Sequence, residues 1–198
     1  MNTIRKQDII LAGVGGQGIL SIAFVVDNAA LKEGLNVKQA EVHGMAQRGG
    51  SVTTHIRYAP KVYSPLIEEG TADVIVAFEM MEALRYIHFL GPKGRLIYDT
   101  HRIDPLPVST GVVERPADEK LSQRLAARAP NRQTVPAFET ALKLGNARVQ
   151  NVVMLGAISC SLEFPEEAYR AAITRLVKPK VVDLNLKAFT EGRALCGQ

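Results

Sequence analysis

The sequence predicts a three-layer, Rossmann-like α/β domain with a mixed, mostly parallel sheet and a helical C-terminal part. A strand, a glycine turn, a helix and a second strand follow one another at the N-terminus, and further buried strands alternate with helical segments after them. The chain has 198 residues, which at about 150 residues per domain corresponds to a single domain, 1–198. The composition, 46% apolar and 22% charged, is that of an ordinary globular protein.

The first half of the chain supplies most of the strands. The apolar run 9–12 predicts a buried strand, and residues 19–33 carry apolar side chains at helical spacing. A second strand is expected at 37–42 and a third at 52–58. Only nine residues separate these two strands, whereas a parallel crossover needs about a dozen or more. We therefore expect an antiparallel strand or hairpin within the parallel pattern.

The chain then completes the sheet and becomes helical. A short partner strand is expected at 62–64, and buried strands at 73–78 and 95–98 flank a helix at 80–90. Residues 101–118 contain three prolines and a glycine, which indicates a turn-rich stretch around one possible strand, 108–113. Later helices are expected at 118–129, 138–144, 151–162, 165–176 and 181–195.

Charge, hydropathy and cysteine content exclude several classes of protein. The 24 basic and 20 acidic residues give a net charge of +4 without a basic run, so no nucleic-acid surface is indicated. The apolar runs are far shorter than the roughly 20 residues of a membrane span, and the N-terminus does not resemble a signal peptide. Cys160 and Cys196 are too few for a disulfide framework, a four-cysteine iron–sulfur site or a Cys/His zinc site. A reducing cytoplasm is the expected compartment.

The sharpest local signal is a glycine loop that satisfies G-x-G-x-x-G between a strand and a helix. Glycine permits a tight turn and lets backbone N–H groups approach a phosphate, which then lies at the positive end of the helix. The alternative is that the glycines only allow the strand and the helix to pack closely. The candidate binding residues of this loop are Gly13, Gly15, Gly16, Gln17 and Gly18.

A second loop, 41–50, follows the second expected strand and would lie beside the first loop at the carboxyl edge of the sheet. Arg48 could form a forked contact with phosphate or carboxylate, and His43 could donate to an anion or transfer a proton. The alternative is an interface loop in which Arg48 pairs with Glu41. The candidate binding residues here are His43, Gln47, Arg48, Gly49 and Gly50.

Other polar residues have simpler interpretations. His55 lies on a strand and is expected to be structural, and Glu79 and Glu82 compensate the dipole of the helix that they precede or begin. Asp99 and His101, at the end of an expected strand, could face the same carboxyl edge of the sheet as the two glycine loops. A solvated or partner-facing surface is expected for the spaced arginines, which are Arg115, Arg124, Arg128, Arg132 and Arg148. No G-x-S-x-G, H-E-x-x-H or Walker A lysine is present, so the catalytic residues are unassigned and a binding role is favoured.

The two glycine motifs, together with 62–67, resemble the gamma-type domain of 2-oxoacid:ferredoxin oxidoreductases. Within that superfamily they most resemble the beta subunits of indolepyruvate ferredoxin oxidoreductases. Segments 70–73, 82–85 and 151–156 agree, and the resemblance extends over about residues 9–173. The loop 41–50 is the specific part of the match, whereas the first glycine motif alone is not.

The resemblance implies a hetero-oligomeric, oxygen-sensitive enzyme of anaerobic metabolism. Such enzymes oxidatively decarboxylate arylpyruvates with coenzyme A and reduce ferredoxin. The same resemblance places thiamine diphosphate and the [4Fe–4S] clusters in a larger alpha subunit, and associates the gamma-type domain with the coenzyme A step. Gly13, Gly15, Gly16, Gln17 and Gly18 would then approach an anionic part of coenzyme A, with Arg48 as a side-chain anchor. The rival hypothesis is that both loops only dock against the large subunit.

Two further function classes remain open from the sequence. The first is a stand-alone NAD(P)-dependent dehydrogenase of Rossmann type, which needs an acidic residue about 20 positions after the glycine loop to hold the ribose. Glu41 lies near that distance, but a glycine-rich loop follows it where a dinucleotide site would have a helix. The second is a non-catalytic interaction protein, which would bind neither NAD(P) nor coenzyme A.

Overall fold

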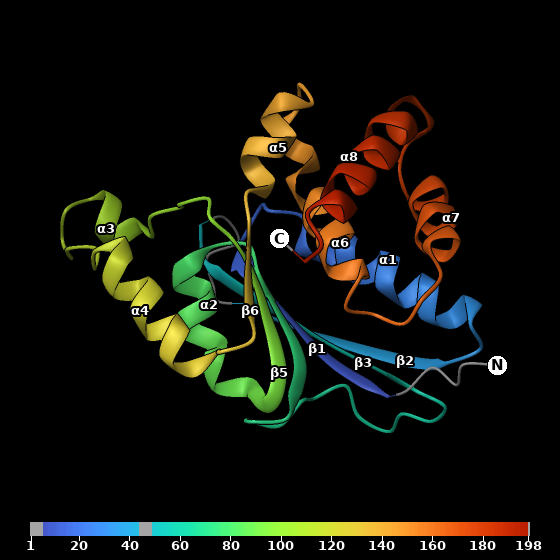
Figure 1. Ribbon diagram of the computed structural model, residues 1–198, viewed down its shortest axis with the longest axis horizontal. Helices are drawn as coiled ribbons and strands as arrows, with labels where there is room; N and C mark the ends of the chain where they lie inside the picture. The colour runs from blue at the N-terminus through green and yellow to red at the C-terminus, as the bar shows by residue number, and fades with distance from the viewer. Residues whose placement is uncertain (1–5, 44–48, 198) are drawn as a thin grey trace.

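The computed structural model describes residues 6–43 and 49–197, which form one six-stranded sheet covered by helices on both faces (Figure 1). The strands are β1 (Gln7–Val14), β2 (Asn36–His43), β3 (Ser51–Ala59), β4 (Ala72–Ala77), β5 (Leu90–Asp99) and β6 (Arg132–Val135). The α-helices are α1 (Ile19–Lys32), α2 (Met80–Tyr86), α3 (Leu106–Ser109), α4 (Asp118–Arg128), α5 (Ala137–Lys143), α6 (Gln150–Ser159), α7 (Glu166–Leu176) and α8 (Val182–Ala194). Short 3-10 turns are η1 (Ile87–Phe89), η2 (Ala147–Val149) and η3 (Pro179–Val181).

The sheet is mixed and mostly parallel, with strand order β2-β3-β1-β4-β5-β6. β1, β4, β5 and β6 run parallel, whereas β3 is antiparallel to both β1 and β2. The short link between β2 and β3 leaves room for a return of the chain but not for a crossover helix, so the predicted antiparallel strand is confirmed.

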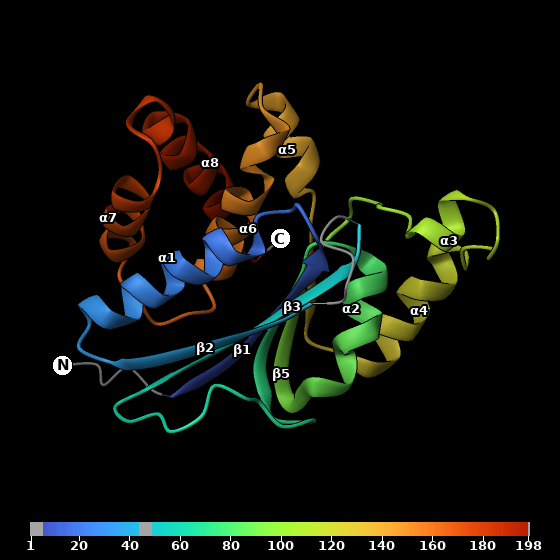
Figure 2. The same ribbon diagram turned by 180° about the vertical axis from the view of Figure 1, so that it is seen from behind.

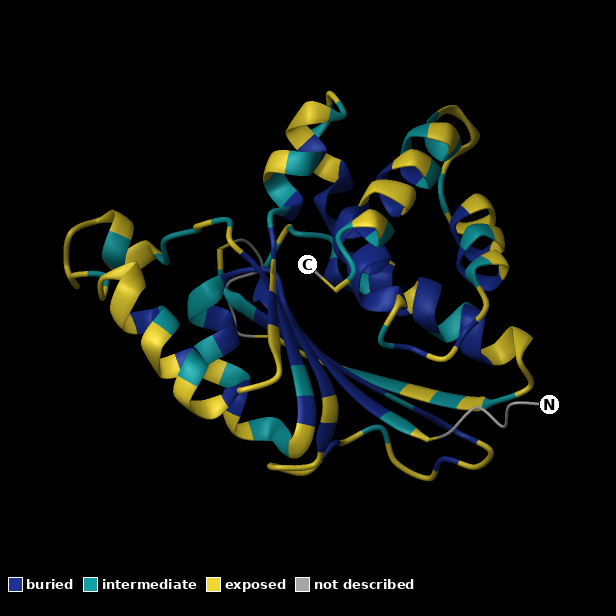
Figure 3. Cartoon of the chain, viewed as in Figure 1, coloured by how far each residue is buried: buried dark blue, intermediate teal, exposed yellow. Residues whose placement is uncertain are grey.

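Helices form the two outer layers, as Figures 1 and 2 show from opposite sides: α1, α6, α7 and α8 cover one face, and α2 and α4 cover the other. Alternate residues of β1 face these two cores, with Ile9 and Leu11 toward α1 and Ile10 toward α2. Figure 3 shows the central strands and α6 almost entirely buried. The three-layer, Rossmann-like α/β prediction is therefore confirmed.

Helix α6 is the centre of the helical C-terminal part, because all ten of its residues are buried. It crosses α8 at a pair of glycines: a Cβ built on Gly192 would lie 2.0 Å from the carbonyl oxygen of Val153, and one on Gly156 would lie 2.3 Å from that of Phe189. The two backbones therefore touch, and only glycine fits at the crossing.

A disulfide joins Cys160, which follows α6, to Cys196, which follows α8. Two cysteines are too few for a framework of several disulfides, and this single bond was not predicted from the sequence. The cysteines are 36 residues apart in the sequence, and only the packing of α8 on α6 brings their Cα atoms to 6.3 Å. The bond ties the end of the chain to the buried helix.

Several predicted elements are wrong. Residues 62–64 form no strand, and the possible strand at 108–113 is replaced by the end of α3 and a turn. Strand β5 begins at Leu90, earlier than expected: Leu90 pairs with Ala72, and a Cβ on Gly94 would lie 2.7 Å from the carbonyl oxygen of Ala72, so the backbones approach closely there. The short edge strand β6 was not predicted. None of the helices in the described ranges is long and apolar enough to cross a membrane.

Candidate functional site

The structure brings the two glycine loops together at the carboxyl end of β1. The N–H of Gly15 donates to the carbonyl oxygen of Gly50 over 2.9 Å, and the N–H of Gly49 donates to that of Gly15 over 3.5 Å. Because β3 runs antiparallel to β1, its first residue, Ser51, lies opposite Val14. Gln47 and Arg48 lie outside the described residues.

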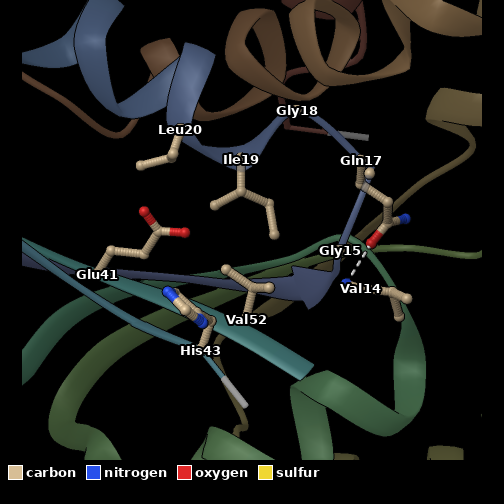
Figure 4. A pocket seen from close by; sticks show the side chains of 10 residues that line it. Val14, Gly15, Gln17, Gly18, Ile19, Leu20, Glu41, His43 and Val52 are labelled. Carbon is tan, nitrogen blue, oxygen red and sulfur yellow. Dashed lines mark hydrogen bonds between the residues drawn. The ribbon is translucent and has the colours of Figure 1, made fainter. Parts of the chain in front are cut away.

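The side chain of Gln17 holds the first loop in place from within (Figure 4). Its Oε1 accepts from the N–H of Val14 over 2.7 Å, and its Nε2 donates to the carbonyl oxygen of Phe78 over 2.8 Å. The carboxamide therefore joins the end of β1 to the residue after β4. A Cβ on Gly13 would lie 2.7 Å from Gln17 Oε1, so Gly13 provides space for this bridge. Both residues have structural roles here.

Gly16 and Gly18 give the loop its backbone shape. Their φ angles, +106° and +75°, lie in the region that L side chains rarely adopt. Gly18 is also the N-cap of α1, and its carbonyl oxygen accepts from Nδ2 of Asn151 on α6 over 3.3 Å. A Cβ on Gly18 would lie 2.4 Å from that nitrogen. The loop is thus fitted against α6 as well as against the sheet.

A cavity of about 430 Å³ opens beside the loop, within the range of ligand pockets. Its residues are Val14, Gly15, Gly16, Gln17, Gly18, Ile19, Leu20, Glu41, His43 and Val52. Figure 4 shows Glu41 reaching from β2 toward α1 and His43 lying beside Val52. The pairing of Glu41 with Thr54 and of His43 with Val52 places both side chains on the face that α1 covers. Of the predicted site residues that the structure describes, Gly15, Gly16, Gln17, Gly18 and His43 line this cavity, whereas Gly13, Gly49 and Gly50 do not.

The start of α1 gives the cavity a region of positive potential. Gly18 offers no side chain to cap the helix, and the first turn of α1 has no acidic residue. Among the described residues, no side chain caps this turn, so its N–H groups can donate to a ligand, and the helix dipole adds to their effect. Glu41, on the opposite wall, can accept hydrogen bonds from hydroxyl or amino groups. The described lining contains no Ser, Cys or Lys nucleophile, so the arrangement is suited to binding rather than covalent catalysis.

A buried ion pair at the start of α2 was not predicted from the sequence. Oε2 of Glu79 accepts from the backbone N–H groups of Met81 and Glu82, at 2.5 and 3.2 Å, and caps α2 as expected. Its other oxygen pairs with Arg115 Nη2 at 2.9 Å. The Arg115 side chain is only 5% exposed and also pairs with Asp104 at 3.1 Å. The expectation of a surface role for Arg115 is therefore wrong.

Ser51, the first residue after the second loop, is anchored on α2. Its hydroxyl donates to the buried carboxylate of Glu82 and lies 3.0 Å from the hydroxyl of Tyr86. Arg85 Nε also contacts Glu82, at 3.2 Å. This network could not be predicted, because Ser51 and α2 are about 30 residues apart in the sequence, far beyond the spacing of neighbouring side chains on one helix.

Asp99, which was expected to be able to face the same edge of the sheet as the glycine loops, does not line the glycine-loop cavity and instead joins three elements of the fold. It is fully buried and accepts from His101 N, Ala137 N and Gln150 Nε2 at 3.0, 3.2 and 2.7 Å. Burial raises its pKa, although these donors act in the opposite direction. The carboxylate thus joins β5 to the starts of α5 and α6.

His55 is structural as well. Its Nδ1 accepts from the N–H of Ile67 over 3.1 Å, and burial, with a smaller contribution from Arg57, lowers its pKa. Among the described residues, no group of three or more His, Cys, Asp or Glu side chains could hold a metal ion.

Comparison with known proteins gives consistent matches over nearly the whole chain. The family model described as pyruvate ferredoxin/flavodoxin oxidoreductase matches residues 8–195. A protein of Archaeoglobus fulgidus named indolepyruvate oxidoreductase subunit IorB is 43% identical over 189 residues, 94% of each chain. The IorB protein of Pyrococcus horikoshii is 40% identical over 193 residues, 96% of this chain and 95% of that one.

Solved structures share the fold. The pyruvate oxidoreductase subunit PORC of Thermotoga maritima superposes with a TM-score of 0.73 at 21% identity, covering 96% of this chain and 97% of that one. A 2-oxoglutarate:ferredoxin oxidoreductase of Magnetococcus marinus, solved with 2-oxoglutarate, coenzyme A and succinyl-CoA bound, gives a TM-score of 0.72 at 23% identity. This chain covers 31% of the Magnetococcus chain, with 96% of its own length aligned.

Proposed function

The chain belongs to the pyruvate ferredoxin/flavodoxin oxidoreductase family, and we propose that within a 2-oxoacid:ferredoxin oxidoreductase it is the small subunit that completes the active site and the coenzyme A site of a larger subunit. The complex is cytoplasmic, and its substrate is an arylpyruvate such as indolepyruvate. The 2-oxoacid and coenzyme A give an acyl-CoA and CO2, and two electrons pass to ferredoxin. Thiamine diphosphate and [4Fe–4S] clusters, which we place in the larger subunit, would supply the electron sink for decarboxylation and the electron relay, chemistry that side chains cannot supply.

The observation that carries the coenzyme A proposal is the cavity at the N-terminus of α1, which no side chain caps. Coenzyme A is a polyanion through its phosphate groups, and a helix N-terminus reached through glycines is a ready anion site. The N–H of Gly15 already donates to Gly50, and Gln17 is engaged in the sheet bridge. The anion contacts therefore come from Gly16, Gly18 and the first turn of α1, with Arg48 as the side-chain anchor predicted from the sequence.

A role for Glu41 follows from its place in the same cavity. Its carboxylate reaches toward α1, where it would repel a phosphate but accept hydrogen bonds from a ribose hydroxyl or an adenine amino group (Figure 4). We place the phosphates at the glycine side of the cavity and a hydrogen-bond-donating part of the nucleotide beside Glu41.

Substitution of Leu20 by Glu tests the anion site with little risk to the fold. Leu20 lines the cavity in the first turn of α1, where an added acid favours the helix dipole and repels a bound anion. In the complex with the large subunit, we expect Leu20→Glu to raise the KM for coenzyme A by about tenfold or more. Leu31→Glu is the matched control, because Leu31 is 57% exposed in the last turn of the same helix.

Three outcomes separate the hypotheses. A raised KM with normal assembly, in Leu20→Glu and also in Arg48→Ala, supports the coenzyme A site. Loss of assembly in either variant, or an unchanged KM in both, would show that the loops only dock the large subunit. Calorimetric titration of the free chain with coenzyme A and, separately, with NADH checks the dehydrogenase alternative, which family membership does not favour.

The partner proposal has its own test. Anaerobic affinity purification of this chain from its native cell should recover a large subunit that contains iron and thiamine diphosphate. Arylpyruvate-dependent reduction of ferredoxin is then the activity to measure. Recovery of a lone chain without either cofactor under gentle conditions would contradict the subunit assignment.

A further inference from the structure

A second cavity, of about 470 Å³, lies on another flank of α1 and contains none of the residues of the glycine-loop cavity. Its walls come from α1, from η2 and the start of α6, from the end of α7, and from η3 and the start of α8. Buried or half-buried apolar side chains form most of its surface, among them Val25, Val152, Ile173 and Leu184. This is the lining expected of a small-molecule pocket.

The charged side chains that the described residues contribute to this cavity are all basic. Arg148, Lys178 and Lys180 line it, each of them is exposed, and no Asp or Glu is among the described lining residues. Within the described part of the chain, the ion pairs involve other basic side chains. Three like charges brought to one mouth repel each other, and a bound anion relieves that repulsion.

Helix polarity adds to the positive potential. Val181, the N-cap of α8, lies in the cavity wall and makes no side-chain capping bond. Asn146 and Val149, which precede α6, lie in the same wall, so the N-terminal ends of two helices border the cavity. The first turn of α8 contains one acidic residue, Asp183, but Asp183 does not line the cavity.

We propose that this cavity binds a small organic carboxylate with an apolar body, at a site separate from the glycine loops. Arg148, Lys178 and Lys180 hold the carboxylate, and Val25, Val152 and Ile173 enclose the body. Both features are needed, because an apolar wall with a basic mouth discriminates against inorganic anions and against neutral apolar molecules. The proposal does not depend on coenzyme A binding at the other cavity.

Calorimetry on the full chain tests this with three probes. Octanoate has an apolar chain and a negative charge, 1-octanol has the apolar chain alone, and inorganic phosphate has the negative charge alone. We expect octanoate to bind with 1:1 stoichiometry and at least about tenfold more tightly than either of the others, since hydrogen bonds to a charged group are the stronger ones. Octanoate binding should be unchanged in Leu20→Glu, which alters only the glycine-loop cavity.

Two variants test the residues. The double variant Lys178→Glu/Lys180→Glu should weaken octanoate binding by about tenfold or more. The control Arg175→Glu/Lys187→Glu makes the same charge change at residues that do not line the cavity, and it should leave octanoate binding unchanged. Leu184→Trp should block the cavity without changing its charge. Circular dichroism and thermal melting establish that each variant is folded. No binding of octanoate, equal binding of octanol, or equal affinity in the two double variants would overturn the proposal.

Discussion

Asp27 makes the stability of this protein depend on pH in a direction opposite to that of most carboxylates. It lies in the middle of α1, and its Oδ1 is buried with no hydrogen-bond partner among the described residues. Burial raises the pKa of Asp27 from an ordinary value of 3.8 to about 7. The folded chain therefore keeps a proton on this carboxyl between about pH 4 and pH 7, where the unfolded chain has lost it.

The sign and size of the effect follow from this difference. The folded state binds more protons than the unfolded state over that range, so stability falls as the pH rises and stays low above pH 7. A difference of about three in pKa corresponds to at most about 4 kcal/mol. Because the side chain is only half-buried, solvent screening reduces this, and we expect about 1–3 kcal/mol.

Substitution of Asp27 by Asn removes the titrating group at nearly constant shape. Urea unfolding of both proteins should give similar free energies of unfolding at pH 4 and a more stable variant at pH 8, by about 1–3 kcal/mol. Glu33→Gln, at an exposed position after the same helix, is the control and should show no such change. A difference between Asp27→Asn and the wild type that stays constant from pH 4 to pH 8 would refute the reasoning.

Two further predictions concern packing. Gly192→Ala should destabilise the chain by about 1–3 kcal/mol in urea unfolding, because its Cβ would meet a backbone carbonyl that cannot move without separating α6 from α8. Arg115→Met should cost about 3–5 kcal/mol, because it leaves the carboxylate of Glu79 buried without its cation.

Their controls are neighbouring surface substitutions. Glu191→Ala, on an exposed part of α8, and Arg102→Met, in an exposed pair with Asp104, should each leave stability nearly unchanged. If Gly192→Ala or Arg115→Met is as mild as its control, the close helix crossing or the buried ion pair does not contribute as described.

The parts of the fold that could be predicted are those whose signal is local. Apolar runs define β1 and β4, glycine and proline end the helices, and the short link after β2 requires an antiparallel β3. Strand β6 has only four residues, two of them exposed, so its existence depends on pairing with β5 rather than on its own pattern. The prolines near α3 suggested extended chain, but a proline at the start of a helix is compatible with it.

In the candidate site, too, the features with a local signal could be predicted and those that depend on distant contacts could not. The glycine spacing predicted the turn and its place beside the second loop, because both follow from local backbone geometry and strand order. The engagement of Gln17 with Phe78 and of Arg115 with Glu79 joins residues 61 and 36 positions apart. A single sequence carries no record of such pairs. In a sequence, a polar residue that hydrogen-bonds within the protein cannot be distinguished from one that binds a ligand.

The hydrogen bonds of Gln17 have a consequence for how fast the proposed anion could associate with the loop. Its carboxamide occupies the N–H at the end of β1 and the carbonyl after β4, so the loop cannot open unless hydrogen bonds at the margin of the sheet break. Fixing a flexible backbone residue costs about 1–2 kcal/mol of conformational entropy, and here folding has already imposed that order on the loop. An anion that binds this loop as proposed would therefore meet one loop geometry, and its association rate would be set by diffusion and charge rather than by a search of the loop for its bound shape.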